Sequence, residues 1–382
     1  MFHIELIFWL AAALILYTYA GYPLLLLVLT KLKKRPIMKS PIQPPVSVVL
    51  AVRNESDHIA ARLRNLCQQD YPAENVEILV VSDGSDDGTD ALVESFPDRR
   101  VKLIRVASPA GKAIAVNAGV AAAGGEIVVF ADARQQFDPT VIRELAANFA
   151  DPSVGCAGGE LVFLNSTDSD VGAEMGAYWK YEKAVRRMES VTGSVIGASG
   201  CIYAVRRALY KPLPAGTILD DVLTPMNIVR QGHRVVFDSS ASAHDVVSKD
   251  AGQEWKRKVR TLTGNWQLLS ISPWLMVPGM NPVWMRFMSH KIFRVKVPFW
   301  LMCLMASSAL LPAPFYQALF FAQLGCYALA GAAALCPTLQ KTKGISFIYF
   351  FAVLNTAAVA GCWKWLRGSS AATWRAAYKG GS

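Results

Sequence analysis

Long apolar stretches bracket a more polar middle region, and this pattern divides the chain. Residues 6–30 contain no charged side chain, and residues 297–340 are again uncharged. Because about 20 apolar residues span the hydrocarbon core of a membrane, the first stretch predicts one membrane helix. Pro312 and Pro314 lie inside the second stretch and favour two helices joined by a tight turn. A third apolar stretch, 344–363, is long enough for another crossing, and a re-entrant or interfacial helix is the alternative.

The middle region instead alternates short apolar runs with segments of helical character. Runs of this length, bounded by turn residues, predict buried strands. In chain order we expect strands at 46–52, 76–85, 101–106 and 126–132, with helices at 57–68, 90–95 and 112–122. Strands that alternate with helices at this spacing predict a parallel, doubly wound sheet. Ligands of such sheets bind beyond the carboxyl ends of the strands.

The composition shifts between these regions predict the domain organisation. Prolines 36, 41, 44 and 45 mark a linker between the first apolar stretch and the middle region. Aromatic and cationic residues interleave between positions 266 and 295, which is typical of a helix lying in the membrane interface. The expected parts are an N-terminal anchor (1–35), a catalytic domain (46–255), interfacial amphipathic helices (256–296), C-terminal membrane helices (297–366) and a tail (367–382).

The net charge of +10 indicates contact with lipid rather than with nucleic acid. Basic residues cluster at the ends of apolar runs, at Lys31, Lys33, Lys34 and Arg35 and again at Lys291, Arg294 and Lys296. Such clusters face anionic headgroups and mark the cytoplasmic side of a membrane, and no basic motif of a nucleic-acid-binding module is present. Because the first cluster follows its apolar run, residues 6–30 predict an anchor that ends in the cytoplasm rather than a signal peptide.

The side of the membrane on which the tail lies stays open at this point. One N-terminal and three C-terminal crossings would place the tail outside. Its basic residues favour the inside, namely Lys364, Arg367, Arg375 and Lys379.

The 7 cysteines show no CxxC spacing, so the sequence indicates neither a zinc site nor a disulfide framework.

Two carboxylates stand at predicted strand ends, where a ligand would bind. Asp83 follows the second strand, and Asp132 ends the fourth. The sequence contains no GxGxxG after the first strand and no GxxxxGK[ST], which argues against a dinucleotide enzyme and a P-loop ATPase. A carboxylate at this position is suited to accept hydrogen bonds from a nucleotide or to hold a divalent cation that bridges phosphates.

Five stretches in this order resemble the GT-A catalytic domain of family 2 glycosyltransferases. They are VSVVLAVRNESDHI, VEILVVSDGSDDGT, GKAIAVNAGVAAAGGEIVVFADA, LDDVLTPMNIVRQGHRVVFD and RKVRTLTGNW. The membrane-bound branch, which contains cellulose, hyaluronan and poly-N-acetylglucosamine synthases, is the most similar. The resemblance implies an α/β, Rossmann-like domain with a mixed or parallel sheet, inserted between N-terminal and C-terminal transmembrane helices.

The resemblance assigns a nucleotide-sugar site. Glu55 and Asp83 would contact the nucleoside, and Lys112 would lie near the diphosphate. For Asp83 the alternative is a carboxylate that caps a turn, and for Lys112 it is a solvated lysine at a helix start. Asp132 would be the first carboxylate of the family's DxD motif, which here reads Asp132-Ala133-Arg134. Arg134 therefore brings a positive charge to where the second carboxylate and the diphosphate would lie.

This departure removes one of the two carboxylates that the motif offers to a metal ion. The cofactor implied by the family is Mg²⁺ or Mn²⁺. The expected ligands are Asp132, Gln136 and His244. Gln136 falls where relatives of the dolichyl-phosphate mannose synthase type carry a metal-binding glutamine. For His244 a structural role is the alternative.

The acceptor side is assigned in the same way. Asp221 resembles the second acid of the family's ED motif, which deprotonates the acceptor, and Asp220 would orient the acceptor. Capping of a helix N-terminus is the alternative for both acids. Arg260 is the residue kept from the QxxRW box and would neutralise the departing diphosphate. The expected acceptor-binding residues are Ser199, Gly200 and Trp266, although a plain small-residue turn is an alternative for the first two.

The sequence thus predicts an inverting, membrane-embedded glycosyltransferase that moves a sugar from a nucleotide sugar, UDP-linked by expectation, to a glycan or lipid-linked acceptor. Two alternatives stay open: transfer of a single sugar to polyprenyl phosphate or another lipid, and a catalytically inactive membrane scaffold. The expected location is a bacterial-type inner membrane, with several crossings and a cytoplasmic catalytic domain. Membrane lipids and polysaccharide-export proteins are the further partners expected, and no nucleic acid.

Overall fold

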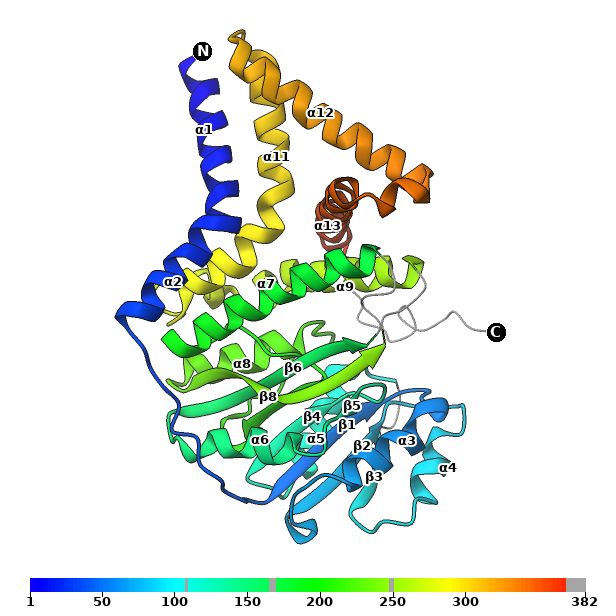
Figure 1. Cartoon of the computed structure of the whole chain (residues 1–382). Coiled ribbons are helices and arrows are strands. Elements are labelled where there is room, and N and C mark those ends of the chain that lie inside the picture. Colours follow the sequence, from blue (N-terminus) through cyan, green and yellow to red (C-terminus); the bar gives the residue numbers. More distant parts are fainter. Residues whose placement is uncertain (107–108, 165–169, 247–250, 369–382) are drawn as a thin grey trace.

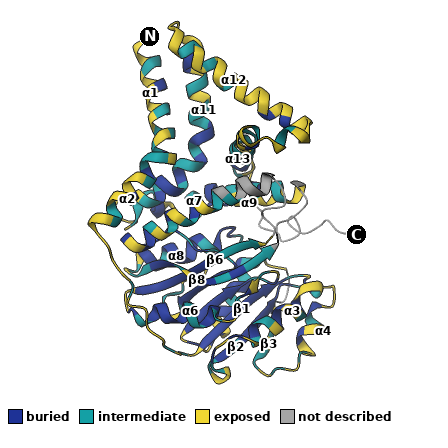
Figure 2. Ribbon diagram, viewed as in Figure 1, coloured by how far each residue is buried: buried dark blue, intermediate teal, exposed yellow. Residues whose placement is uncertain are grey.

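The computed structural model describes residues 1–106, 109–164, 170–246 and 251–368. A mixed α/β domain forms the lower part in Figure 1, and long helices from both ends of the chain rise from it. Figure 2 shows that burial is concentrated in the sheet, whereas the long helices carry many exposed positions.

One eight-stranded sheet forms the centre of the domain, with the order β3-β2-β1-β4-β7-β6-β8-β5. Strands β1 to β4 are mutually parallel, as the sequence predicts, whereas β7 is antiparallel to β4 and makes the sheet mixed. The later strands have no counterpart among those expected from the sequence. The strands are β1 Val46–Val52, β2 Val76–Ser82, β3 Val101–Arg105, β4 Ile127–Ala131, β5 Gln136–Phe137, β6 Val154–Leu164, β7 Ile202–Arg206 and β8 Arg234–Val246.

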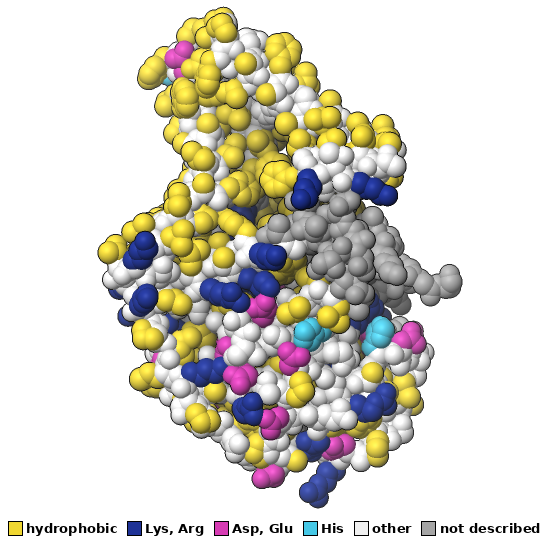
Figure 3. Space-filling model, in the orientation of Figure 1, with side chains coloured by type: hydrophobic (Ala, Val, Ile, Leu, Met, Phe, Trp, Pro, Cys, Tyr) yellow, Lys and Arg dark blue, Asp and Glu magenta, His cyan; other side chains and the backbone are white. Residues whose placement is uncertain are grey.

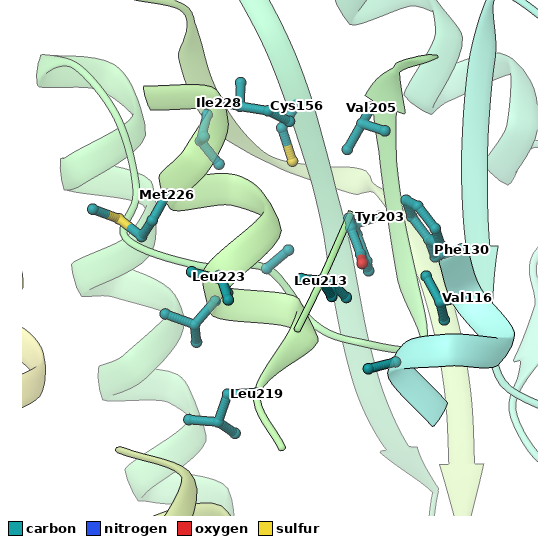
Figure 4. Close-up of a cluster of buried hydrophobic side chains, with 14 of the residues drawn as sticks. Val116, Phe130, Cys156, Tyr203, Val205, Leu213, Leu219, Leu223, Met226 and Ile228 are labelled. Carbon is teal, nitrogen blue, oxygen red and sulfur yellow. The ribbon is translucent and has the colours of Figure 1, made fainter. Parts of the chain in front are cut away.

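Helices cover both faces of this sheet, so its strands are buried on two sides. Alternate residues of β1 point to opposite faces: Val49 joins one hydrophobic cluster, and Val48 joins the other. Figure 4 shows the first cluster, in which Phe130 and Tyr203 stack with ring centroids 4.5 Å apart. A Cβ at Gly119 would lie 2.5 Å from Val49, so the glycine allows α5 to approach β1. The covering helices are α3 Ser56–Cys67, α4 Thr89–Glu94, α5 Lys112–Ala122, α6 Val141–Ala147 and α8 Asp220–Arg230.

Two longer helices, α7 (Asp170–Thr192) and α9 (Ala251–Ile271), lie between the domain and the apolar helices (Figure 1). The sequence predicts interfacial amphipathic helices over 256–296, and the structure divides this region into separate helices. Helix α9 ends at Ile271, a short turn follows, and a new helix begins at Trp284. Three prolines between positions 272 and 283 explain the break, because proline interrupts helical hydrogen bonding.

Among the residues that the structure describes, four helices are long and apolar enough to cross a membrane: Phe2–Leu32, Trp284–Leu310, Pro314–Leu335 and Lys343–Leu366. The first contains α1 (Phe2–Leu16) and α2 (Tyr22–Leu32), the second contains α11 (Phe293–Leu310), and the others are α12 and α13. The predicted turn near Pro312 is confirmed between α11 and α12. In Figure 3 hydrophobic side chains cover the upper part of the face shown, and Lys and Arg side chains appear below them.

A buried polar cluster fastens the first and second of these helices to α7. The ring of His290 lies between two glutamates of α7, with Nδ1 2.9 Å from Glu189 and Nε2 3.1 Å from Glu182. Tyr22 donates to Glu189 at 2.5 Å, and Arg294 donates to Glu182 at 2.6 Å. Burial alone would raise the pKa of Glu182, but the neighbouring cations outweigh it and hold that pKa well below its ordinary value.

Candidate active site

A cleft open to solvent lies at the carboxyl ends of β1 and β4, where the sheet order predicts a ligand site. Its lining residues come from five separate segments of the chain. They are Ala51, Glu55, Lys112, Asp132, Ala133, Arg134, Gln135 and Arg260. Five of the residues predicted from the sequence are therefore brought together here.

Lys112 lies at the centre of the charged contacts in this cleft. It is the first residue of α5, and its ammonium lies 3.0 Å from Asp132 Oδ1 and 3.5 Å from Asp220 Oδ2. Burial lowers the pKa of Lys112, but the two carboxylates outweigh it, so the pKa is raised overall. Lys112 is thus a fixed cation held by two acids rather than a solvated lysine at a helix start.

Asp83 holds the turn that delivers Lys112. Its side chain is fully buried, and its two carboxylate oxygens accept the backbone N–H groups of Ala110 (2.7 Å) and Gly111 (2.9 Å). Gly111 has φ +92°, a left-handed conformation that suits glycine. The contacts of Asp83 therefore match the turn-capping alternative, and its contact with a nucleoside stays a prediction.

Glu55 and Arg134 face each other across the cleft, with Arg134 Nε 3.5 Å from Glu55 Oε2. Glu55 is buried, and its backbone N–H donates to Thr89 Oγ1 at 2.9 Å. Burial raises the pKa of Glu55, and the positive charge of Arg134 opposes that shift. Arg134, in the altered DxD position, therefore points into the cleft and contributes positive charge there.

Asp220 and Asp221 begin α8 and differ in environment. Asp220 is buried and faces Lys112. Burial is the main cause that raises the pKa of Asp221 to about 6, and the negative charge of Asp220 adds to it. The cations Lys291 and Lys112 lower this pKa and so oppose the shift. A Cβ at Gly200 would lie 3.3 Å from Asp221 Oδ2, so the loop containing Gly200 lies directly against this carboxylate. A carboxylate with a pKa near 6 is suited to accept a proton near neutral pH.

The remaining acceptor-side predictions lie in different surroundings. Ser199 precedes Gly200, and its hydroxyl accepts a hydrogen bond from Arg186 of α7 at 3.1 Å. Trp266 stacks on Trp365 of α13 with ring centroids 5.9 Å apart and does not line the cleft. Its predicted contact with an acceptor stays a prediction.

Of the expected metal ligands, Asp132 alone lines the cleft. Gln136 and His244 are paired across β5 and β8, and His244 Nε2 lies 2.9 Å from Asp138 Oδ1. Within the described ranges, no group of three or more His, Cys, Asp or Glu side chains converges on one point. A magnesium ion bound with substrate phosphates needs only one or two carboxylates, so Asp132 fits that limited role.

Two cations near Asp221 are absent from the sequence-based predictions, Arg186 and Lys291, both of which lower the pKa of Asp221. Lys291 carries a signal that sequence reasoning has available: a cation in a helix apolar enough to cross a membrane is a candidate functional residue. Arg186 carries no comparable signal, because α7 contains charges of both signs along its length.

Known proteins resemble this chain in both sequence and fold. The family model "Glycosyl transferase family 2" matches residues 47–213. Poly-beta-1,6-N-acetyl-D-glucosamine synthase of Staphylococcus aureus is 24% identical over 243 residues, which are 62% of this chain and 58% of that protein. The synthase of the same name from Staphylococcus epidermidis is 23% identical over 234 residues, covering 60% and 56% of the two chains. The matched regions thus span less than two thirds of these relatives.

The solved structure of a mannosyltransferase from Pyrobaculum calidifontis, in complex with GDP-Man and Mn²⁺, has the same fold. It superposes with a TM-score of 0.69 and 23% sequence identity, over 95% of this chain and 99% of that one. This likeness confirms that the sheet domain has the GT-A fold and that apolar helices flank it. The family match over residues 47–213, the related synthases and this fold indicate that the chain is a glycosyltransferase similar to those of family 2.

Proposed function

We propose that this protein is an inverting, membrane-embedded glycosyltransferase that transfers a sugar from a nucleotide sugar, a UDP-sugar by preference, to a glycan or lipid-linked acceptor. One observation carries the proposal. The cleft gathers the cations Lys112, Arg134 and Arg260 and opens beside an acid pair in which Asp221 has a pKa near 6. Such a site is suited to hold a nucleoside diphosphate and to deprotonate a hydroxyl group.

The donor would lie in the cleft with its diphosphate among the cations. Arg260 and Arg134 offer guanidinium groups that pair with phosphate oxygens, and Lys112 offers a fixed ammonium. Glu55 and Asp83 are assigned to the nucleoside on the basis of the family resemblance. Positive charge that is already in place stabilises the leaving diphosphate without reorganisation during the reaction.

The chemical step would be a direct displacement. The acceptor oxygen attacks the anomeric carbon, the bond from that carbon to the diphosphate oxygen breaks, and Asp221 takes the acceptor proton. The nucleoside diphosphate leaves with the bonding electrons, and the anomeric configuration inverts. Asp220 would orient Lys112 and the acceptor, and the Ser199–Gly200 loop would form the acceptor wall beside Asp221.

A divalent cation would supply further neutralisation of the diphosphate charge. We propose Asp132 as its carboxylate ligand. Gln136 and His244 are weaker candidates for metal ligands than Asp132. They face each other across β5 and β8, and His244 contacts Asp138 rather than Asp132. Lys112 and Arg134 already supply positive charge here, so this protein should depend on the cation less than a site with two carboxylates does.

The proposed location is a plasma membrane of bacterial type, with the catalytic domain on the cytoplasmic side. The exposed basic residues between positions 31 and 35 lie at the C-terminal end of the first apolar helix, which supports this orientation. Membrane lipids are the partners that this arrangement requires, and polysaccharide-export proteins are proposed as further partners.

The deciding experiment measures nucleotide release by membranes that contain the full chain, supplied with a panel of UDP- and GDP-linked sugars. We expect release with at least one UDP-sugar, and loss of that release in Asp221→Asn. Glu126→Gln, an exposed carboxylate outside the cleft, is the matched control. Release unchanged in Asp221→Asn would contradict the proposed site. Product length on a gel then distinguishes polymer synthesis from transfer of one sugar.

A further inference from the structure

Lys291 is a cation within the helix Trp284–Leu310, which is apolar enough to cross a membrane. Its side chain is partly buried. Its neighbours His290 and Arg294 pair directly with glutamates, whereas no carboxylate of the described residues lies within 4.0 Å of the Lys291 ammonium. A charge in such a helix is costly unless it has a partner or a function. The position of Lys291 therefore needs an explanation other than a direct ion pair.

The polar side chains around Lys291 fix this helix to the catalytic domain. His290 lies between two glutamates of α7, and Arg294 donates to one of them at 2.6 Å. Arg286 donates to two backbone carbonyls, those of Glu189 at 2.5 Å and Ser194 at 2.9 Å. These contacts hold both the position and the rotation of the helix. The direction in which Lys291 points is therefore set by the fold.

The loop 193–200 connects this helix with Asp221. At the start of the loop, a Cβ at Gly193 would lie 3.0 Å from Arg286 Nη2. At its end, the backbone N–H of Ala198 donates to the carbonyl of Asp221 at 2.8 Å, and a Cβ at Gly200 would lie 3.3 Å from Asp221 Oδ2. The second membrane helix and the proposed base thus contact opposite ends of one short loop.

The titratable groups that act on Asp221 come from five elements. They are Asp220 of α8, Lys112 of α5, Arg186 of α7, Tyr203 of β7 and Lys291 of the membrane helix. Among the cations, Lys291 lowers the pKa of Asp221 the most. In turn, Asp221 is the acid that acts most strongly on Lys291. Because the two groups lie more than 4.0 Å apart, the effect acts through space and leaves room beside the carboxylate.

Burial and the charge of Asp220 both favour the protonated form of Asp221. A protonated carboxyl group cannot accept a proton from an acceptor hydroxyl. We propose that Lys291 is a positioning residue of the active site, which the second membrane helix brings toward Asp221 so that this carboxylate stays ionised near neutral pH. The inference rests on the proposed function, in which Asp221 is the base. It makes the membrane helix a part of the catalytic machinery as well as an anchor.

The test replaces Lys291 with methionine in the full chain. Nucleotide release is measured in detergent between pH 4.5 and 8, with the UDP-sugar that is active in the donor panel. Loss of the cation should raise the acid limb by about one pH unit, from about 6 to about 7. Turnover of Lys291→Met at pH 6 should therefore fall about fivefold below wild type, whereas turnover at pH 8 should be nearly unchanged.

Three companion variants separate charge from structure. Lys291→Arg keeps the positive charge and should keep the acid limb near pH 6. Lys296→Met, which removes another lysine of the same helix, should also keep it there. Lys291→Gln should move the limb as Lys291→Met does, and it serves if the methionine variant does not fold. An acid limb that stays near pH 6 in both neutral variants of Lys291, or an equal loss of turnover at pH 6 and pH 8, would overturn the proposal.

Infrared difference titration gives a readout that does not depend on turnover. The carboxyl band that is absent from Asp221→Asn belongs to Asp221, and its midpoint should lie about one pH unit higher in Lys291→Met than in wild type. If the wild-type chain releases no nucleotide from any donor, the proposed function fails, and the band still reports whether Lys291 acts on Asp221. If release is normal and the midpoint does not move, the membrane enzyme stands and the role of Lys291 is refuted.

Discussion

The titration of Asp221 gives the sharpest test of the catalytic assignment. Its pKa is raised to about 6 by burial and by the neighbouring charge of Asp220. The raised value means that the ionised base is present above pH 6 and is lost as the pH falls through that value. With a pKa of 6, about 90% of Asp221 is ionised at pH 7 and about 9% at pH 5. Turnover at saturating donor should therefore fall about tenfold over this interval.

Substitution of Asp221 tests its role as the general base independently of pH. Asp221→Asn removes the proton acceptor and should lower turnover by about 100-fold to 10,000-fold, the usual contribution of a general base. Donor affinity should change little, because Asp221 is not among the residues that line the cleft. The residual activity of this variant should no longer fall between pH 7 and pH 5. Asp220→Asn, which removes the like charge, should move the acid limb of the wild-type profile to lower pH.

The assay is continuous nucleotide release from detergent-purified protein between pH 4.5 and 8, with donor affinity measured separately by calorimetry. Glu126→Gln, made and purified in parallel, should retain the wild-type profile. Turnover of Asp221→Asn within about threefold of wild type, or an acid limb near pH 6 that survives in that variant, would refute Asp221 as the base.

Three further predictions concern the metal, the buried cluster and the α9 contact. Arg134→Asp should lower the Mn²⁺ concentration for half-saturation by about tenfold, because it replaces a repelling cation with a ligand. Electron paramagnetic resonance with nucleoside diphosphate present measures this concentration. An unchanged value would exclude Arg134 from the diphosphate region. Glu182→Ala should destabilise the protein by about 3 kcal/mol in detergent denaturation, because it leaves buried cations unpaired; a loss below about 1 kcal/mol would contradict the cluster's role. Gly264→Ala should lower turnover and stability, since its Cβ would lie 2.6 Å from Leu219 Cγ, whereas Gly331→Ala, with no atom within 4 Å, should change neither.

Much of the fold follows from local pattern. The apolar runs predict each end of β1 to β4 to within three residues, because a strand buried on both faces must be apolar throughout. The uncharged stretch 297–340 predicts α11, α12 and the turn between them, because each membrane crossing needs about 20 apolar residues. Strands β6 to β8, of which β7 runs antiparallel to its neighbours, cannot be predicted in this way. Their order in the sheet depends on pairing between distant segments, and apolar periodicity carries no information about partners.

The sequence by itself determined which residues are candidates for the chemistry, and the tertiary structure decided which of them meet. Five motifs in order point to the family and to Lys112, Asp132 and Asp220. Their convergence within 3.5 Å of one ammonium depends on sheet order, since the second acid is 108 positions from the lysine. The raised pKa of Asp221 likewise arises from burial and neighbouring charge. For residues 344–363, hydropathy allows a crossing and an in-plane helix alike, and only the tertiary structure shows that this segment packs against α9.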